Sequence, residues 1–315
     1  MDHASRPRML AADAQGIAEA AVILRSGGLV AVPTETVYGL AARADRDESV
    51  AAIYRAKGRP TFNPLIVHVE DIAGAARLAV LDERAVQLAE AFWPGALTLV
   101  LPLRDSAPIA MAVTAGLPTI AVRCPAHKVM RAVIAETGLP LAAPSANRSG
   151  GVSPTSAAHV ASSLGGAVDA ILDGGASEAG IESTIVALRE NGRWQVLRPG
   201  PIPQESIAAV LGRAPDAVTS AAIEAPGQLA SHYAPGKPVR LGALGADPDE
   251  FLIGFGDVAG HASLSTGGDL SEAAARLYAL LHEAAASSHP RIAVAPIPEE
   301  GIGAAINDRL RRAAA

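Results

Sequence analysis

Hydroxyl groups and a carboxylate gather where the first apolar run of the sequence ends. The run at 29–32 leads directly into the segment PTETVYGL at 33–40, which carries Thr34, Glu35 and Thr36. Ligands of open α/β sheets bind where the chain leaves a strand, so this segment is a candidate binding site. The alternative interpretation is a capped turn into the next helix.

Two cations stand close together some twenty residues further on, in the segment KGRP. Lys57 and Arg59 follow a predicted helix, and Asn63 precedes the next apolar run. Cations at a helix C-terminus often only complement the helix dipole. Here, however, Gly58 and Pro60 stiffen the turn and hold both cations near the following strand. A triphosphate site needs such a pair, because arginine grips phosphate oxygens bidentately and lysine supplies a point charge.

Two further candidates lie within or at the end of apolar runs. His68 alternates with Val67 and Val69, so its side chain lies on the opposite side of the strand from theirs. A lone histidine in a strand is usually structural. Arg123 closes the run TIAVR, and a guanidinium beside so apolar a segment needs a partner because unpaired burial is costly. A substrate carboxylate would be a fitting partner.

Loops of small polar residues follow other apolar runs. APSANRSG at 143–150, GIEST at 180–184 and LRPG at 197–200 offer backbone N–H groups, hydroxyls and another arginine. Neither GxxxxGK[ST] nor GxGxxG occurs, and the sequence has no cysteine–histidine cluster at zinc spacing and no GxSxG motif. The candidates are cations and hydroxyls rather than a nucleophile with its base. They suit stabilisation of charge on a transferring nucleotidyl group.

Composition and charge disfavour several other functions. The formal charge of −6 and the lack of a long basic run, apart from the arginine cluster at 309–312, disfavour tight autonomous RNA binding. The single cysteine, Cys124, cannot form an internal disulfide. No run approaches the roughly 18 apolar residues of a membrane span, and the first ten residues do not resemble a secretory signal. The expected location is the cytoplasm, with no membrane association.

The elements that must position these residues form an α/β pattern. Half of the 315 residues are hydrophobic but only 3% are aromatic, as suits buried strands covered by alanine-rich helices. Helical spacing at 14–25, 48–56, 83–92 and 127–136 alternates with strand-like runs at 29–32, 65–69, 97–101, 119–123, 139–143 and 170–172. The runs 184–188 and 194–197 flank Asn191-Gly192, a strong hairpin signal, so the sheet should be mixed.

A second, smaller domain follows a linker. Periodicity lapses at 213–238, and then strand-like runs at 239–241, 251–255 and 292–296 alternate with helices at about 271–286 and 304–312. This alternation predicts a small parallel α/β domain. The predicted organisation is therefore residues 1–212, a linker at 213–238, and a C-terminal domain at 239–315.

Taken in order, these segments resemble a known family. PTETVYGL, KGRP with NPLIVHV, TIAVRCPAH, APSANRSG, IESTIV, LRPG and SHYAP resemble the YrdC-type threonylcarbamoyl-AMP synthases in their long, two-domain form. The resemblance implies a twisted mixed-sheet catalytic domain and a small parallel, Rossmann-like C-terminal domain. It implies a nucleotidyltransferase that joins L-threonine, bicarbonate or CO2, and ATP into threonylcarbamoyl-AMP and pyrophosphate. This is the first step of threonylcarbamoyl-adenosine formation in tRNA.

The resemblance also assigns site residues. It implies threonine binding by Thr36, His68, Arg123, Ala143 and Ser183, with Arg123 on the threonine carboxylate. It implies ATP binding by Lys57, Arg59, Asn63, Thr119, Ser145, Asn147, Ser153, Arg198 and Tyr233, with Tyr233 folding back from the linker over the nucleotide. Lys57 and Arg59 would be catalytic. Mg2+ would come with the ATP phosphates rather than with dedicated protein ligands. The product would pass to a tRNA threonylcarbamoyl transferase complex, with weak or no direct tRNA binding.

Two other functions remain as alternatives at this point. One is an RNA-binding or regulatory module that recognises tRNA without chemistry. The other is a carbamoyl-adenylate-forming enzyme of hydrogenase maturation, although those enzymes embed the domain in a longer chain with cysteine-rich zinc segments. The C-terminal domain has no cluster of titratable groups, and we expect it to act as a structural clamp that anchors the linker.

Overall fold

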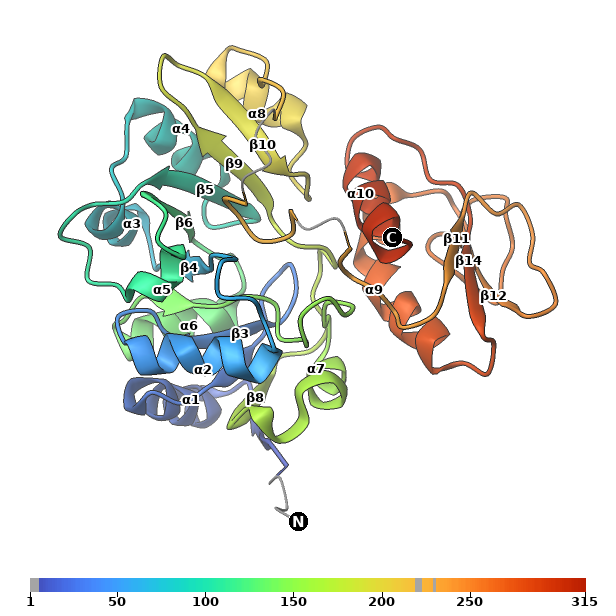
Figure 1. Ribbon diagram of the computed structural model, residues 1–315, viewed down its shortest axis with the longest axis horizontal. Helices are drawn as coiled ribbons and strands as arrows, with labels where there is room; N and C mark the ends of the chain where they lie inside the picture. The colour runs from blue at the N-terminus through green and yellow to red at the C-terminus, as the bar shows by residue number, and fades with distance from the viewer. Residues whose placement is uncertain (1–5, 219–222, 229–230) are drawn as a thin grey trace.

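The computed structural model divides the chain between two sheets with a connecting segment (Figure 1). It describes residues 6–218, 223–228 and 231–315. Residues 1–5 of the predicted catalytic domain and 219–222 and 229–230 of the predicted linker lie outside the described residues. Within the described part of the linker, no helix or strand occurs between α8 and β11.

The first part of the chain alternates strands and helices. Its strands are β1 (Arg8–Ala11), β2 (Val30–Val32), β3 (Gly39–Arg43), β4 (Ile66–His68), β5 (Leu97–Pro102), β6 (Thr119–Arg123), β7 (Leu141–Ala142), β8 (Ala170–Asp173), β9 (Thr184–Leu188) and β10 (Trp194–Arg198). Its helices are α1 (Ala14–Ser26), α2 (Asp47–Lys57), α3 (Ile72–Leu78), α4 (Glu83–Phe92), α5 (Met111–Thr114), α6 (Lys128–Thr137), α7 (Ala157–Leu164) and α8 (Gln204–Leu211).

These strands form one mixed sheet in the order β1-β8-β2-β3-β7-β4-β6-β5-β9-β10. Parallel pairs such as β4 with β6 and β5 with β9 stand beside antiparallel pairs such as β5 with β6. The predicted hairpin joins β9 to β10, and both Asn191 and Gly192 have the positive φ that a tight hairpin turn requires. The prediction of a mixed sheet is confirmed.

The two faces of this sheet are covered differently. Helices α2, α3, α4, α7 and α8 pack on one face and enclose the largest apolar core. On the other face α1 and α6 cover β2, β3, β7 and β8. Over β4, β5, β6 and β9 on this second face lies Ala225 of the linker instead of a helix. The second face is therefore open to the linker along half of its width.

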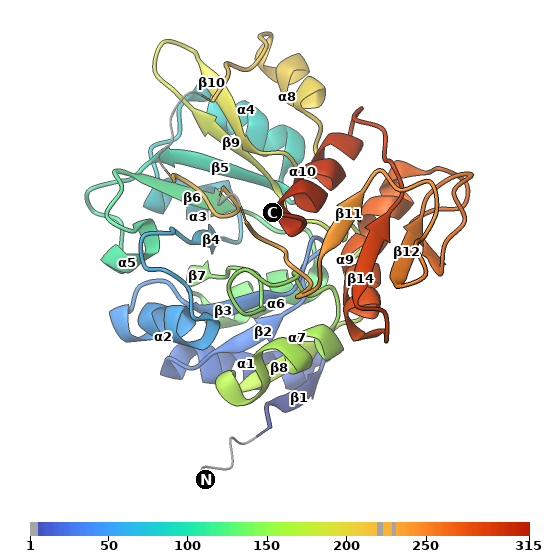
Figure 2. The ribbon, with the colours of Figure 1, turned by 45° about the vertical axis from the view of Figure 1, so that its right-hand side comes forward.

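The second sheet, formed by the C-terminal part, is small and wholly parallel. It consists of β11 (Val239–Leu241), β12 (Glu250–Gly254), β13 (Ala262–Ser263) and β14 (Arg291–Val294), in the order β11-β14-β12-β13. Helices α9 (Leu270–Ala286) and α10 (Gly303–Ala313) pack against it. Figures 1 and 2 show both helices on the side of this sheet that faces the large domain. The prediction of a parallel C-terminal sheet is confirmed.

Candidate active site

The site lies on the sheet face that the helices leave open. Side chains alternate along a strand, so while Val67 packs into the large core, its neighbour His68 points to the opposite face. The register of β4 and β6 sets His68 directly beside Arg123. Ser183, just before β9, reaches the same face and bonds through its hydroxyl to Thr98 of β5 at 2.7 Å. Because side chains alternate between the two faces of a strand, residues far apart in the sequence meet on this face of the sheet.

Arg123 is buried and organises one end of the site. Its Nη1 donates to the hydroxyl of Thr36 at 2.9 Å, its Nη2 to Oε1 of Glu35 at 2.6 Å, and its Nε to the carbonyl of Gly95 at 3.1 Å. Burial raises the pKa of Glu35, but the charge of Arg123 and the hydrogen bonds to the carboxylate together outweigh it, so the pKa lies below its usual value. Glu35 is therefore an anion, and its Oε2 has no hydrogen-bond partner among the described residues.

His68 is a neutral group beside this arginine. Burial, and then the nearby charge of Arg123, lower the pKa of His68 to about 3. Its Nδ1 is buried without a hydrogen-bond partner in the described part of the chain. A buried polar atom with no partner is costly, so it is well placed to meet a polar group of a ligand.

Lys57 is held inside the protein at the other end of the site. It ends helix α2, and the left-handed C-cap Gly58 turns the chain toward Arg59. The Lys57 ammonium donates to the carbonyls of Ser145 and Asn147, at 2.5 Å each, so it ties the loop after β7 to α2. Burial, with a smaller contribution from Arg59, lowers the pKa of Lys57 well below its usual value.

Arg59 is oriented by backbone carbonyls rather than by a carboxylate. Its Nε donates to the carbonyl of Asn63 at 3.2 Å and its Nη2 to that of Pro64 at 2.9 Å. Burial lowers the pKa of Arg59 to about 10, which leaves the guanidinium charged at neutral pH. Both amide atoms of the Asn63 side chain, and Oδ1 of Asn147, are buried without a hydrogen-bond partner among the described residues. A charged donor and unused amide groups together suit an anionic, polar ligand.

Arg198 brings a further cation from the end of β10. Its Nε and Nη2 donate to the carbonyl of Ser183 at 3.1 and 3.0 Å, and its Nη1 donates to the carbonyl of Pro226 at 3.4 Å. Arg198 therefore joins the sheet to the linker segment that lies over it.

One cavity connects these groups. It is lined by Thr34, Thr36, Val37, Gly39, Arg59, Ile66, His68, Arg123, Ala143, Pro144, Ser145, Glu182, Ser183, Arg198, Pro226, Gly227, His232 and Tyr233. Its volume is about 40 Å³, enough for a few water molecules. Ligand pockets for molecules of nucleotide size hold roughly 300–1,000 Å³. The cavity is therefore too small for a nucleotide in this arrangement, and linker residues form part of its wall.

Tyr233 shows how tightly the linker is held over the site. Its φ of 63° lies in the left-handed region, which is strained for an aromatic residue and persists only where the surroundings fix it. On one side the N–H of Ala234 donates to the carbonyl of Gly150 at 2.8 Å. On the other, the N–H of His232 donates to the carbonyl of Arg312 at 3.1 Å. We call residues 231–234 the strap.

Comparisons with known proteins agree on one family. Residues 22–200 match the family model described as "Telomere recombination" (Sua5, YciO and YrdC), and residues 202–315 match "Threonylcarbamoyl-AMP synthase, C-terminal domain". The chain is 41% identical to a threonylcarbamoyl-AMP synthase of Bacillus subtilis, over 95% of this chain and 92% of that protein. It is 40% identical to one of Pyrococcus abyssi, over 93% and 92%. The chain belongs to the threonylcarbamoyl-AMP synthase family.

A solved structure agrees with this assignment. The crystal structure of P. abyssi Sua5 complexed with L-threonine matches with a TM-score of 0.88 and 36% identity, over 98% of both chains. The prediction of a nucleotidyltransferase that makes threonylcarbamoyl-AMP is confirmed, as is its two-domain fold. The predicted boundary at residue 212 falls on Gly212, the C-cap of α8, within the part that the C-terminal family model matches.

The structure places most of the residues expected for this synthase family around the cavity. Those that line it are Thr36, Arg59, His68, Arg123, Ala143, Ser145, Ser183, Arg198 and Tyr233. Lys57, Asn63 and Ser153 do not line it, but each bonds to a residue that does. The carbonyl of Asn147, like that of Ser145, accepts a hydrogen bond from the Lys57 ammonium. Thr119 starts β6 on the same face as Arg123 but does not line the cavity, and Ala121 between them packs against Ala225.

Three residues of the site were not singled out from the sequence. Glu182 is the only carboxylate among the lining residues, all of them in the described part of the chain. His232 lines the cavity beside Tyr233, within the quoted motif SHYAP. Arg309 lies in the C-terminal domain and bonds to Glu182 at 3.0 Å. The motifs IESTIV and SHYAP contained a signal for the first two, whereas Arg309 lies 127 residues from its partner and has no local signal.

No metal cage is formed by the protein in the described ranges. Among those residues no group of three or more histidine, cysteine, aspartate or glutamate side chains is arranged to hold a metal ion. None of the helices described has the length and apolar character that crossing a bilayer requires.

Proposed function

We propose that this cavity binds L-threonine at one end and ATP at the other, and joins them with bicarbonate or CO2. The observation that carries the proposal is that Arg123 and neutral His68 share one cavity with Arg59 and Arg198. Arg123 and Thr36 would bind the threonine carboxylate and hydroxyl, with His68, Ala143 and Ser183 around the side chain. Arg59, Lys57 and Arg198 would bind the phosphates, with Asn63, Ser145, Asn147, Ser153 and Thr119 completing the ATP site.

The chemistry requires no protein nucleophile. The threonine amine attacks CO2 with loss of a proton to water, or bicarbonate with loss of water, to give a carbamate. The carbamate oxygen then attacks the α-phosphorus of ATP, and the bond to the β-phosphate oxygen breaks to release pyrophosphate. Arg59 and Lys57 stabilise the negative charge that grows on the leaving phosphates, and their fixed contacts to backbone carbonyls keep them in place for that step.

Mg2+ would accompany ATP. The lining of the cavity fits this proposal, because its one carboxylate, Glu182, already accepts from Ser153, Tyr278 and Arg309 and has little capacity left for a metal. The ion, when bound, would neutralise part of the phosphate charge.

The strap and residues 226–227 act as a lid in this proposal. They occupy the space next to Arg198 and Arg59, so they must move outward for ATP to enter. When they return with Tyr233, they would exclude water from the carbamate, which is short-lived in water.

The fate of the product also belongs to this proposal. Threonylcarbamoyl-AMP is a mixed anhydride that reacts readily with water, so we propose transfer to a tRNA threonylcarbamoyl transferase complex in the cytoplasm. The formal charge of −6 supports weak or no direct tRNA binding.

Pyrophosphate release tests the function. The purified chain with ATP and Mg2+ should release pyrophosphate only when threonine and bicarbonate are both present. Each is omitted in turn, and serine replaces threonine as a control for the methyl group. Release that continues without threonine would contradict the proposed reaction.

A further inference from the structure

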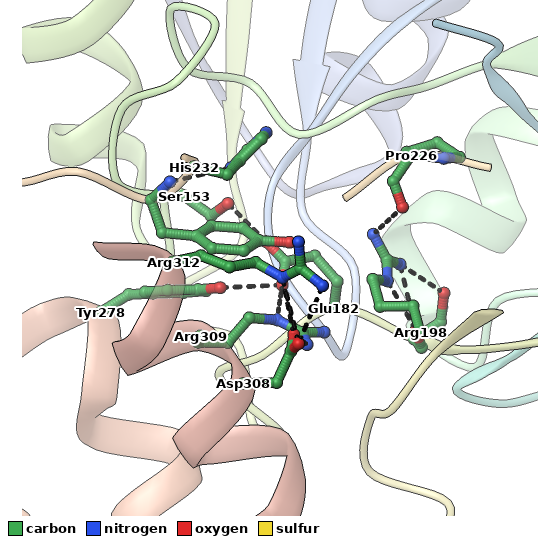
Figure 3. A network of polar contacts seen from close by, with 11 residues as sticks. Ser153, Glu182, Arg198, Pro226, His232, Tyr278, Asp308, Arg309 and Arg312 are labelled. Carbon is green, nitrogen blue, oxygen red and sulfur yellow. Dashed lines mark hydrogen bonds and ion pairs between the residues drawn. The ribbon is translucent and has the colours of Figure 1, made fainter. Parts of the chain in front are cut away.

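A buried ion pair joins the C-terminal domain to the active site (Figure 3). Nε of Arg309, in α10, donates to Oε2 of Glu182 at 3.0 Å, and the hydroxyl of Tyr278, in α9, donates to the same oxygen at 2.8 Å. The other oxygen, Oε1, accepts from the hydroxyl of Ser153 at 2.5 Å. Glu182 thus receives two bonds from the C-terminal domain and one from the predicted ATP site.

The pair is desolvated on both sides. The Arg309 side chain is 0% exposed and that of Glu182 is 8% exposed. Burial raises the pKa of Glu182, but Arg309 and then Arg198 lower it to about 2 overall, so the carboxylate is charged. Two buried charges are costly for folding, and an apolar pair of the same size often serves stability as well. Stability therefore gives a weak reason for the presence of this pair.

Arg309 also contacts the strap. Its guanidinium carbon lies 5.4 Å from the centre of the Tyr233 ring, within the range of a cation–π interaction. The ring of Tyr233 stacks on Tyr278 with centres 5.6 Å apart. The last turn of α10 accepts the N–H of His232 through the carbonyl of Arg312 at 3.1 Å. The closed strap thus lies on a surface that α9 and α10 supply.

We propose that Arg309 is a positioning residue for ATP, which acts from outside the cavity by orienting Glu182 and the ring of Tyr233. Through Glu182 it fixes the hydroxyl of Ser153, and through Tyr233 it fixes the closed position of the strap. The proposal rests on the proposed function in so far as it takes Ser153 and Tyr233 as parts of the ATP site. It gives the C-terminal domain a role in nucleotide affinity.

Threonine binding at the other end of the cavity serves as an internal control for an effect on ATP binding. The bonds of Arg123 go to Thr36, Glu35 and Gly95, all within the large domain. Removal of Arg309 should therefore change ATP binding and leave threonine binding intact. A purely structural role for Arg309 would not separate the two substrates in this way.

The test compares Arg309→Gln with Arg311→Gln as a matched control. Arg311 lies two residues away on α10, and its ion pair with Glu299 is exposed. For Arg309→Gln we expect the Kd and the KM for ATP to rise about tenfold, while the KM for threonine changes by less than about twofold. Arg309→Lys, which keeps the charge, should recover part of the ATP affinity. Arg311→Gln should match the wild-type chain.

A milder variant covers the case in which Arg309→Gln does not fold. Tyr278→Phe keeps the stacked ring and removes only the bond to Glu182, and it should raise the Kd for ATP about threefold. A lower Tm with unchanged ATP affinity in the variants that fold, or equal losses for ATP and threonine, would overturn the inference. Because ATP binding is measured without turnover, this result is independent of pyrophosphate release, whose failure in the wild-type chain would instead contradict the proposed function.

Discussion

Charge at the level of single residues divides the cavity into two kinds of environment. At one end Arg123 is neutralised by the anion Glu35, with neutral His68 alongside. At the other end Arg59 and Lys57 donate to backbone carbonyls. Because carbonyls rather than a carboxylate orient Arg59, whose pKa of about 10 leaves it charged at neutral pH, its charge is available to an incoming anion. The phosphates should therefore be attracted to the Lys57 end, and the zwitterionic amino acid to the Arg123 end.

Removal of either cation at the phosphate end should slow the chemistry. We expect Arg59→Ala and Lys57→Ala each to lower kcat about a hundredfold, similar to the loss of one oxyanion-stabilising donor. The measurement is steady-state pyrophosphate release at saturating threonine and bicarbonate. Arg55→Ala is the matched control, because Arg55 is exposed on the same helix, α2. Near-normal kcat in both variants would contradict the assigned roles.

The sequence singles out individual residues where a motif surrounds them. Lys57, Arg59, His68 and Arg123 stand out because charged groups next to apolar runs need an explanation. Arg309 could not be predicted in the same way. It stands in a helix with other arginines nearby, and only the folded chain reveals that it alone of 309, 311 and 312 is fully buried.

At the level of elements, the linker segment over the sheet depends on one close approach. Gly227 has a φ of 86°, and a Cβ there would lie 2.8 Å from Cδ of Arg198 and 2.9 Å from the hydroxyl oxygen of Tyr233. Real Cβ atoms essentially never come so close to another heavy atom. Only glycine therefore allows residues 226–227 to lie on Arg198 with Tyr233 in place.

Gly227→Ala should loosen the closed lid. We expect the KM for ATP to rise several-fold, because the added methyl group separates the segment from Arg198 and Tyr233. Gly236→Ala is the control, since Gly236 has a similar φ of 79° but no atom within 4 Å of a Cβ. Because both variants place a Cβ at a similar positive φ, a difference between them in the KM for ATP reports the contact. Equal values would show that the contact has no role.

The prediction of elements was uneven. Long periodic segments such as 14–25 and 83–92 are helices α1 and α4 in the structure. Strand β3 was missed because its residues, GLAAR, are small and follow a polar motif without alternation. Helix α7 was missed although Ser156 caps it, since residues 143–156 before it are mostly small and polar. The burial of both depends on tertiary neighbours, which periodicity does not report.

At the level of the whole molecule, two histidines meet across the domain interface. His159 of α7 stacks on His282 of α9, with ring centres 4.0 Å apart and an angle of 22° between the planes. Burial, and then the neighbouring His282, lower the pKa of His159 to about 4, and burial lowers the pKa of His282. Both rings are therefore neutral at pH 7, as such close stacking requires.

This stack should make the fold less stable in mild acid. A histidine in the unfolded chain has a pKa of about 6.5. Below that pH the unfolded chain therefore binds protons that the stacked histidines of the folded chain do not bind. Its stabilising contribution is complete above about pH 6.5 and is lost as the pH falls toward the folded value of about 4. We expect the free energy of unfolding in urea to fall between pH 7 and pH 5, and His159→Asn to make that fall smaller. Parallel pH profiles for the variant and the wild-type chain would show that the stack does not titrate in this range. His68 and His232, with pKa values of about 3, resist protonation for the same reason, so part of the pH dependence should remain in the variant.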